Sequence, residues 1–360
     1  ANLAAWAAYL KFNHPKEFFI ALLRMAKYEP SPHEEINKIC QELSFFGIEL
    51  LPPDLAKSGM DFKIEGDDIR FGLNSIKGVS EKSLQALHDF RNSESPTKYD
   101  IFLSAKEAGL NIGILSALIQ AGSLSEYKTR RSRLVLEAQA FNILTDREKR
   151  NFEALGSQYN WDVLNTIQAV VTDSLVGDDG RPLMKDSRFG TFRKKYDAYK
   201  AIYDKNRKYE DFANWYFENK LLGYSPTIAL KEVFSESGER FGDSLDFKGL
   251  ELNSRGRFIG VVADLFKGIS KNGNSYLKVM IRDEVGEYPV MLMDRRARDE
   301  SGRWGMNNAL SRFNNKNPEG LSKDSIVIFD GSKAEDILFA HSFRVMNEKI
   351  YMKLSEISVA

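Results

Sequence analysis

Apolar residues in positions 1–52 recur at helical spacing. Pro15 and Pro32 each stand where a helix can start, because the first turn does not use the amide hydrogen that proline lacks. Gly47 can end the second of these helices. The stripe of that helix that would face a core consists of Ile36, Ile39 and Leu43. The pattern predicts helices up to the Pro-Pro pair at 52–53, which forces extended backbone.

Residues 60–73 alternate apolar and polar side chains on both sides of Gly66-Asp67-Asp68, which predicts a β-hairpin. A second Gly-Asp-Asp triplet occupies 177–179. Paired carboxylates can hold the metal ions of a polymerase palm. Glycine and aspartate are also common turn formers, and no third acid in a strand context accompanies either triplet. We therefore interpret both triplets as turns and expect neither a catalytic nor a metal site in this chain.

Two helix-turn-helix patterns follow in tandem within residues 69–125. In the first, "IKGVSEKSLQAL" places Gly78 in a tight loop before a helical pattern. In the second, we expect a helix to end at Ala108–Gly109. Asn111 can then cap the next helix, and Gly122 can end it. The pattern predicts a tandem helix-hairpin-helix module.

The first loop carries the candidate duplex contacts. Such a loop grips DNA by pointing backbone amides at a phosphate, which requires a glycine at the close approach and a helix N-terminus behind it. Ser80 stands where a second glycine is usual, and its side chain can cap the following helix. A plain helical linker is the alternative interpretation. The predicted duplex-binding residues are Lys77, Gly78, Val79, Ser80 and Lys82, with Arg130, Arg131 and Arg133 of the basic segment "KTRRSR".

From Arg255 onward the pattern changes to strands. Five alternating segments are separated by turn-forming residues, with an irregular insertion after the third strand. This arrangement predicts a five-stranded oligonucleotide-binding (OB) β-barrel. Residues 126–220, which precede this predicted barrel, have the weakest pattern in the chain. We expect helices joined by an exposed loop there.

The strand predicted at 275–283 has two different faces. Leu277, Val279 and Ile281 would point to the barrel interior. The other face pairs an aromatic ring with cations, which suits base stacking and phosphate neutralisation. A solvated strand face is the equally simple interpretation. The predicted single-strand-binding residues are Arg255, Arg257, Tyr276, Lys278 and Arg282.

Composition narrows the alternatives. The 51 basic residues equal the 51 acidic ones, so nucleic-acid affinity must come from local patches. Cys40 is the one cysteine among 360 residues, and the four histidines have no metal-ligand spacing, so the sequence predicts no disulfide, metal site or bound cofactor. A long apolar run and a signal-peptide pattern are absent from the sequence, which favours a cytoplasmic protein without membrane contact. The first residue is alanine, and we expect the chain to begin inside a larger protein.

Four segments in order resemble the alpha subunit of bacterial DNA polymerase III, a C-family replicative polymerase. They are "AAYLKFNHPKEFFIALL", "GIELLPPDLAKSGMDF", "IRFGLNSIKGVSEKSLQAL" and "LSALIQAGSL". Residues 221–227, "LLGYSPT", resemble the link before that family's OB domain, and 255–357 resemble the domain itself. The resemblance implies nucleotidyl transfer to a primer, with duplex held behind the palm and single-stranded template met by the barrel.

The resemblance also implies what lies elsewhere. The family's metal-binding aspartates belong to a palm upstream of the matching region, so Mg²⁺ is expected for the complete polymerase and this chain alone is expected to be inactive. The family carries a sliding-clamp peptide between its two DNA-binding modules. Here "QYNWD" has Gln158 and Trp161 but ends in Asp162, where an aromatic residue is wanted, so clamp binding is left open.

The expected fold is α+β and multidomain. We predict a fingers-like helical region with a hairpin (1–68), the tandem helix-hairpin-helix module (69–125), a helical linker region (126–245) and an OB domain (246–360). Two functions compete. One is a polymerase portion, truncated or encoded by a split or phage gene, that works with a palm-bearing part. The other is a stand-alone, non-enzymatic DNA-binding protein derived from that scaffold. The fingers-like helices favour the first.

Overall fold

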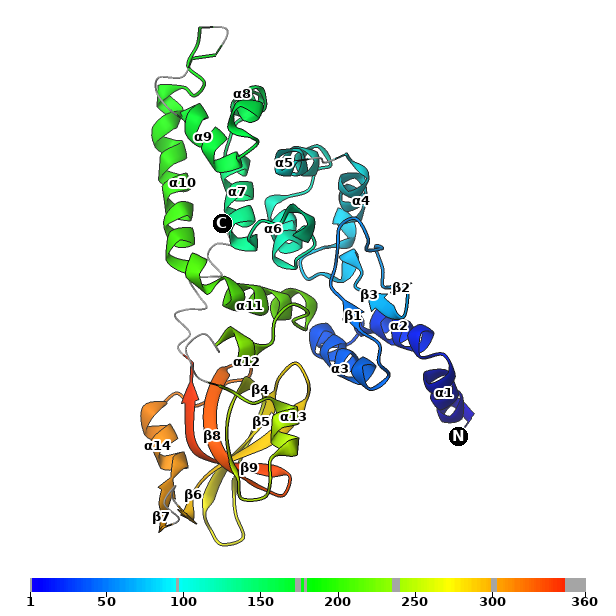
Figure 1. Ribbon diagram of the computed structural model, residues 1–360, viewed down its shortest axis with the longest axis vertical. Helices are drawn as coiled ribbons and strands as arrows, with labels where there is room; N and C mark the ends of the chain where they lie inside the picture. The colour runs from blue at the N-terminus through cyan, green and yellow to red at the C-terminus, as the bar shows by residue number, and fades with distance from the viewer. Residues whose placement is uncertain are drawn as a thin grey trace. The chain divides into compact units, whose positions relative to one another are not determined.

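The computed structural model describes residues 2–94, 97–171, 176–177, 180–234, 240–298 and 303–346. Internal contacts divide these residues into a first unit that extends to Thr227 and a second unit that starts at Ile228. The first unit is mainly helical, and the second is built around a six-stranded sheet (Figure 1). The chain is therefore an α+β protein. Its finer four-part division stays a prediction.

The first unit begins with three helices and a small sheet. The helices are α1 (Asn2–Asn13), α2 (Pro15–Ala26) and α3 (Pro32–Phe45), and the strands are β1 (Leu50–Leu51), β2 (Lys63–Glu65) and β3 (Asp68–Arg70). Pro15 and Pro32 start their helices, and Gly47 follows α3 at φ +67°, as the pattern predicted. The predicted apolar stripe of α3 is buried. The predicted helical stretch also contains a strand, because Leu50 pairs in parallel with Ile69 of the hairpin.

The two predicted helix-turn-helix patterns are present. Their elements are a 3-10 helix (Glu81–Ser83), α4 (Leu84–Asn92), α5 (Lys98–Glu107) and α6 (Ile112–Gln120). Gly109 and Gly122 adopt φ values of +73° and +85°, and the Asn111 side chain caps α6 by accepting from the Ile114 amide at 2.9 Å. The glycine and cap positions predicted for the second pattern are thus confirmed.

Further helices follow in the described residues of the first unit. They are α7 (Arg131–Asn142), α8 (Asp146–Gly156), α9 (Val163–Val171), α10 (Asp186–Asn206) and α11 (Glu210–Leu222). Aromatic rings join α5 to this group, because Tyr99 stacks on Phe152 with centroids 4.8 Å apart and on Trp161 with centroids 5.6 Å apart. Trp161 follows a 3-10 helix (Ser157–Tyr159) and packs on Gly156. A Cβ at Gly156 would come within 2.1 Å of the indole.

The described residues of the second unit form helices and strands. They are α12 (Leu230–Val233), α13 (Ser244–Gly249), α14 (Ala309–Lys316), β4 (Arg255–Ile269), β5 (Ser275–Arg282), β6 (Glu287–Arg298), β7 (Trp304–Asn308), β8 (Ile326–Ala334) and β9 (Ile337–Val345). The strand order is β5-β4-β8-β9-β6-β7, and β5 also pairs with β6. Five strands thereby form a partial ring, with a short β6–β9 contact of two residue pairs.

All five predicted strands are present, but the sheet has a sixth strand that the pattern did not predict. The segment expected to be irregular contains β7, which pairs antiparallel with the end of β6 outside the ring, and α14. The part of the last predicted strand beyond residue 346 lies outside the described residues. Leu277, Val279 and Ile281 are buried, as the alternation in β5 predicted.

Candidate nucleic-acid interface

The first hairpin loop exposes backbone donors. Gly78 has φ +96°, a conformation that side chains with a Cβ rarely adopt, and a Cβ there would meet nothing within 4 Å. The Lys77 amide donates to the Leu221 carbonyl at 2.9 Å and the Val79 amide to the Ile76 carbonyl at 3.1 Å. Among the described residues, the amides of Gly78, Ser80, Glu81 and Lys82 have no acceptor. The loop therefore presents four donors ahead of α4.

Two serines and two lysines surround these amides. Ser80 occupies the N-cap position of the 3-10 helix, but its hydroxyl contacts the Ser83 hydroxyl at 3.0 Å instead of capping a backbone amide. The side-chain cap expected of Ser80 is therefore not formed, and the amides stay unpaired. Lys77 and Lys82 are exposed, and within the described chain neither forms an ion pair. Their charges are available to an anion at the loop.

The second hairpin loop has the same construction, which the sequence analysis missed. Gly109 at φ +73° precedes Leu110 and the cap Asn111. In the described structure the amides of Asn111, Ile112 and Gly113 have no acceptor. The sequence contains the signal for this second loop, since a glycine, an apolar residue and a short polar residue occupy 78–80 and again 109–111. Sequence reasoning found the turn but did not read it as a second set of donors.

Two of the three predicted arginines form internal ion pairs. Arg131 donates to Glu218, which is fully buried, at 2.5 Å, and Arg133 contacts Glu137 and Asp162, both at 2.9 Å. Their charges are thereby neutralised inside the first unit. Arg130 is exposed at the N-cap of α7. Among the described residues, Arg130 is thus the one of the three without an ion pair.

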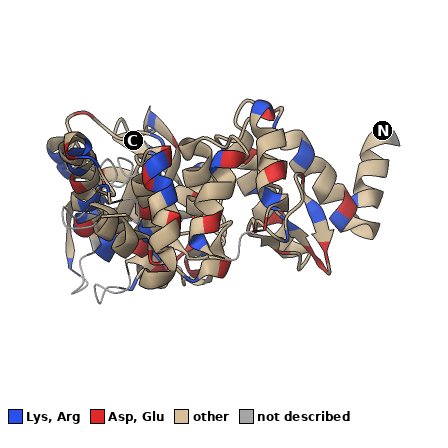
Figure 2. Cartoon of the chain, turned by 90° about the horizontal axis from the view of Figure 1, so that it is seen from above, with Lys and Arg blue, Asp and Glu red and all other residues tan. Residues whose placement is uncertain are grey.

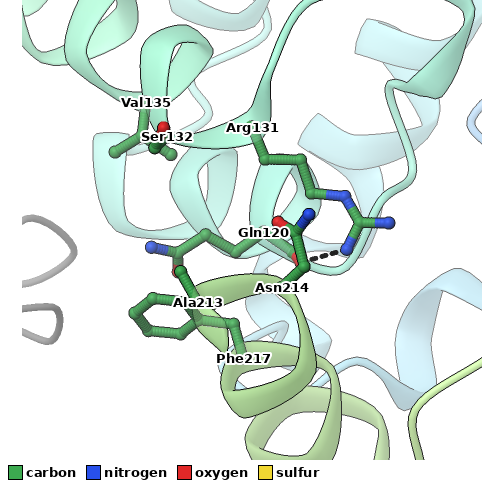
Figure 3. Close-up of a pocket in the computed structure, with 7 residues that line it drawn as sticks. All are labelled: Gln120, Arg131, Ser132, Val135, Ala213, Asn214 and Phe217. Atoms are coloured by element: carbon green, nitrogen blue, oxygen red, sulfur yellow. Dashed lines mark hydrogen bonds between the residues drawn. The ribbon is translucent and has the colours of Figure 1, made fainter. Parts of the chain in front are cut away.

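The same helix start borders a small pocket between α6, α7 and α11 (Figure 3). It is lined by Gln120, Arg131, Ser132, Val135, Ala213, Asn214 and Phe217. The Arg131 guanidinium in this pocket also donates to the Gln120 carbonyl at 3.2 Å. Since the one charged lining residue is already paired, the pocket offers no reactive group of its own.

The outer face of the ring carries part of the predicted single-strand surface. Tyr276 lies over Gly268 of β4, where a Cβ would come within 2.5 Å of the ring, and its ring centroid is 6.2 Å from that of Phe266. Phe266 is 60 % exposed. Lys278 is the next residue on this face and pairs with Phe266 across the strands. Arg282 is half-buried and lies 3.6 Å from the Asp324 carboxylate.

Arg255 and Arg257 lie elsewhere. They occupy the start of β4, where it pairs with β8, whereas Tyr276 and Lys278 lie opposite the second half of β4. The guanidinium of Arg257 is 5.3 Å from the centre of the Phe241 ring. The structure therefore brings Tyr276 and Lys278 together with Phe266, which sequence reasoning had not singled out, but does not bring all five predicted residues to one place.

The remaining motifs make internal contacts where they are described. Asp67 forms an ion pair with Lys16 at 3.0 Å, and the Asp68 carboxylate accepts from the Glu49 amide at 2.9 Å, so the first triplet is a hairpin turn. Part of the second triplet lies outside the described residues. Trp161 of "QYNWD" packs in the aromatic group of the first unit.

Figure 2 shows basic and acidic positions interspersed along the helices. Among the described residues, no group of three potential metal ligands was found. Within the same residues, no helix is both long and apolar enough to span a bilayer.

Comparison with known proteins supports the motif. A family model described as a helix-hairpin-helix motif matches residues 47–134. The DNA polymerase III subunit alpha of Aquifex aeolicus is 33 % identical over 136 residues, which cover 37 % of this chain and 11 % of that protein. The Thermus aquaticus protein of the same name is 32 % identical over 130 residues, 36 % of this chain and 10 % of that protein.

A longer match extends beyond the motif. The DNA polymerase III subunit alpha of Mycobacterium tuberculosis strain H37Rv is 24 % identical over 293 residues, which cover 79 % of this chain and 22 % of that protein. The matched part of the chain thus spans a tenth to a fifth of the length of these relatives. The chain is homologous to a portion of the DNA polymerase III alpha subunit.

Proposed function

We propose that this chain is a DNA-binding portion of a polymerase III alpha-like replicative enzyme, and that its helix-hairpin-helix module holds the primer–template duplex. One observation carries the proposal. Two hairpin loops, at Gly78 and Gly109, each place unpaired amides at the start of a helix. Helix N-termini attract anions because their amides and the helix dipole point at the ligand. Two such loops suit a ligand that repeats its phosphates, as a nucleic-acid strand does.

The contacts would be independent of base sequence. Amides and lysines reach phosphate oxygens, which position a protein on a duplex without reading its bases. Lys77 and Lys82 would add charge at the first loop, and Arg130 is a further candidate. Phosphate contacts of this kind fit a polymerase, which must move along any template.

For the second unit we propose an OB-type barrel that meets single-stranded template. The partial ring of β4, β5, β6, β8 and β9 supports this architecture. Tyr276 and Phe266 offer rings for base stacking, and Lys278 beside them offers a positive charge. These three residues form the proposed single-strand surface.

Nucleotidyl transfer itself is assigned to another part of the enzyme. The proposal places the catalytic carboxylates and their Mg²⁺ in a palm-bearing part that would be this chain's main protein partner, and it leaves clamp binding open. Helices α1 to α3 favour this proposal over a stand-alone DNA-binding protein, because a protein that only binds DNA has little use for a fingers-like region.

The first test is duplex binding by the full chain, followed by fluorescence anisotropy at several salt concentrations. Gly78→Val and Gly109→Val are each expected to weaken binding, because valine cannot easily hold the positive φ that aims the amides. Replacing Lys77 by glutamine should lower the salt slope by about 1.

Gly66→Val is the matched control. Gly66 also has a positive φ, +64°, and open space around its Cβ, but it lies at the β2–β3 turn. If all three glycine variants bind duplex equally well, or equally poorly, the hairpin loops are not the contact and the module is a structural linker.

A further inference from the structure

A group of polar and cationic side chains surrounds a histidine on the outside of the second unit. We call it the His341 cluster, and its members are Ser332, Arg295, Asn307, Arg312 and His341. They come from five neighbouring elements, β8, β6, β7, α14 and β9 (Figure 1). A β-bulge brings His341 outward, because Gly331 pairs with Ala340 and Asp330 pairs with Ser342, which leaves His341 without a partner in the register. The cluster shares no residue with the proposed single-strand surface of Phe266, Tyr276 and Lys278.

Hydrogen bonds fix the imidazole. Ser332 Oγ lies 2.7 Å from Nε2, and Asn307 Nδ2 lies 3.5 Å from Nδ1. Asn307 is itself held, since it donates to the Ala340 carbonyl at 2.9 Å and accepts from Arg312 at 3.0 Å. Arg312 also donates to the His341 carbonyl at 2.8 Å. The imidazole is therefore held in place by neighbours that are themselves hydrogen-bonded to other groups.

Two arginines of the cluster have no carboxylate partner. Among the described residues neither Arg295 nor Arg312 forms an ion pair, and Nε of Arg295 is buried without a hydrogen-bond acceptor. The Arg295 guanidinium lies over the Phe339 ring, 3.8 Å from its centre. Burial lowers the pKa of Arg295, which reflects the cost of keeping this charge out of water. A buried donor of a charged group is costly unless an anion or acceptor meets it.

The local field is positive. Burial and then the charge of Arg255 lower the pKa of His341, Asp330 raises it, and Arg295 and Arg312 lower it further. Of the charges that affect this imidazole most strongly, three are cations and one is the Asp330 carboxylate. The Asp330 carboxylate already accepts a hydrogen bond from the Ser342 hydroxyl. A bound anion would offset the repulsion between the two arginines of the cluster and a protonated His341.

Asp294 is the residue before Arg295 in the chain. Its carboxylate accepts from the amide and the hydroxyl of Ser311 in the first turn of α14. It therefore serves that helix start and does not pair with Arg295.

We propose that the His341 cluster is a binding site for a phosphate group, with the guanidinium groups of Arg295 and Arg312 as its charged donors. Guanidinium groups bind phosphate oxygens with paired N–H bonds, and a phosphate has enough acceptor sites for two arginines and a serine hydroxyl. A carboxylate would leave several of these donors unused. The site does not rest on the proposed function, because it involves neither the hairpin loops nor the β5 surface.

The test follows the imidazoles of the full chain by NMR, in inorganic phosphate and in chloride at equal ionic strength. The chain has four histidines, and His341→Asn identifies the resonance of interest. Bound phosphate stabilises imidazolium, so the pKa of His341 is expected to rise saturably with phosphate. A pKa of His341 that responds to phosphate no more than to chloride, or no more than to acetate, overturns the proposal.

Variants locate the donors. Arg295→Gln and Arg312→Gln are each expected to weaken phosphate binding at least about tenfold, because a charge-assisted hydrogen bond is lost. Lys323→Gln removes the same charge from an exposed loop before β8 and is expected to leave the affinity within about twofold. Arg295→Lys keeps the charge and should bind with intermediate affinity, which guards against a Gln variant that folds poorly. Equal affinities for all four variants would overturn the assignment of the donors.

Two phosphate sources are separated by the probe. A single-stranded oligonucleotide that shifts the His341 resonance at lower concentration than inorganic phosphate assigns the site to the backbone of a strand. A response to inorganic phosphate or a mononucleotide alone assigns it to a free phosphate group. Both outcomes support the site, and a response to neither overturns it.

Discussion

At the scale of single residues, backbone conformation and burial decide which groups are available. Gly78 adopts a positive φ in a loop whose amides have no acceptor among the described residues, and the surroundings of Cys40 disfavour its thiolate. Burial, with a smaller effect of Glu49, raises the pKa of the Cys40 thiol to about 12. The reactive species of a cysteine is its thiolate. The single cysteine is therefore expected to be unreactive in the native chain.

Native Cys40 is expected to react very slowly with iodoacetamide at pH 8, where a pKa of about 12 leaves roughly one thiol in 10⁴ ionised. Unfolding in urea restores an ordinary thiol, and the labelling rate should rise steeply. Mass spectrometry of labelled chain over time measures both rates. Similar rates in the native and unfolded chain would contradict the burial of this side chain.

Tyr276→Ala is expected to weaken single-strand binding by the full chain about fivefold or more, because stacking on one aromatic ring contributes about 1–3 kcal/mol. Duplex binding should change much less, since paired bases cannot stack on the ring. Anisotropy titrations with the two forms of one oligonucleotide measure the difference. Tyr28→Ala removes an exposed tyrosine of the first unit as a control. Unchanged single-strand affinity in Tyr276→Ala would show that this strand face is ordinary surface.

At the scale of elements, a buried carboxylate ties the end of α11 to the start of α7. Glu218 accepts from Arg131 at 2.5 Å and from the hydroxyls of Ser225 and Thr227, both at 2.7 Å. A fully buried charge with several donors is costly to disturb, since removing one partner leaves the other unpaired. This contact holds Arg131 away from solvent and explains why that arginine is not a free cation.

Glu218→Gln is expected to lower the free energy of unfolding of the first unit by about 3 kcal/mol, because Arg131, whose side chain is only 18 % exposed, would lose its counterion. Urea denaturation followed by tryptophan fluorescence measures the change. Asp204→Asn breaks an exposed pair with Lys200 on α10 and should cost less than about 1 kcal/mol. If the two substitutions cost the same, the buried pair does not stabilise the unit as proposed.

Much of the element pattern could be predicted from the sequence, because caps, glycine turns and strand alternation are local. Asn111 needed only its neighbours to be recognised as a cap, and Leu277 only the alternation around it. The pairing of Arg131 with Glu218, 87 positions away, was invisible, since a basic segment looks the same whether its charges are free or paired. β7 was missed because "WGMNN" lacks the alternation that marks a half-buried strand, and its place depends on β6.

At the scale of the whole molecule, the proposed function gives each of the two units a different kind of surface for nucleic acid. The hairpin loops offer amides and lysines, and the β5 face offers rings and a lysine. The balanced total charge means that neither surface is reinforced by a global field. Affinity for DNA should therefore depend on these local contacts and fall with salt.

Primer extension by this chain alone, with Mg²⁺ and all four nucleotides, is expected to stay at background, because the proposal assigns the metal-binding carboxylates to another part of the enzyme. Incorporation of labelled nucleotide measures it. The double variant Asp67→Asn, Asp68→Asn tests the first triplet. Extension that survives repurification and disappears in this variant would contradict the interpretation of the triplet as a turn.

The hydrogen bond from the Lys77 amide to the Leu221 carbonyl determines when the first hairpin loop becomes anchored during synthesis. His33 approaches the same carbonyl through Nε2 at 3.2 Å, so three distant parts of the chain meet there. During synthesis the first hairpin loop leaves the ribosome long before residue 221 does. The loop therefore lacks this hydrogen bond until about 144 further residues have been synthesised, because a contact of such long sequence separation forms late. A fragment limited to residues 47–134 would keep the matched motif but lose this anchor permanently.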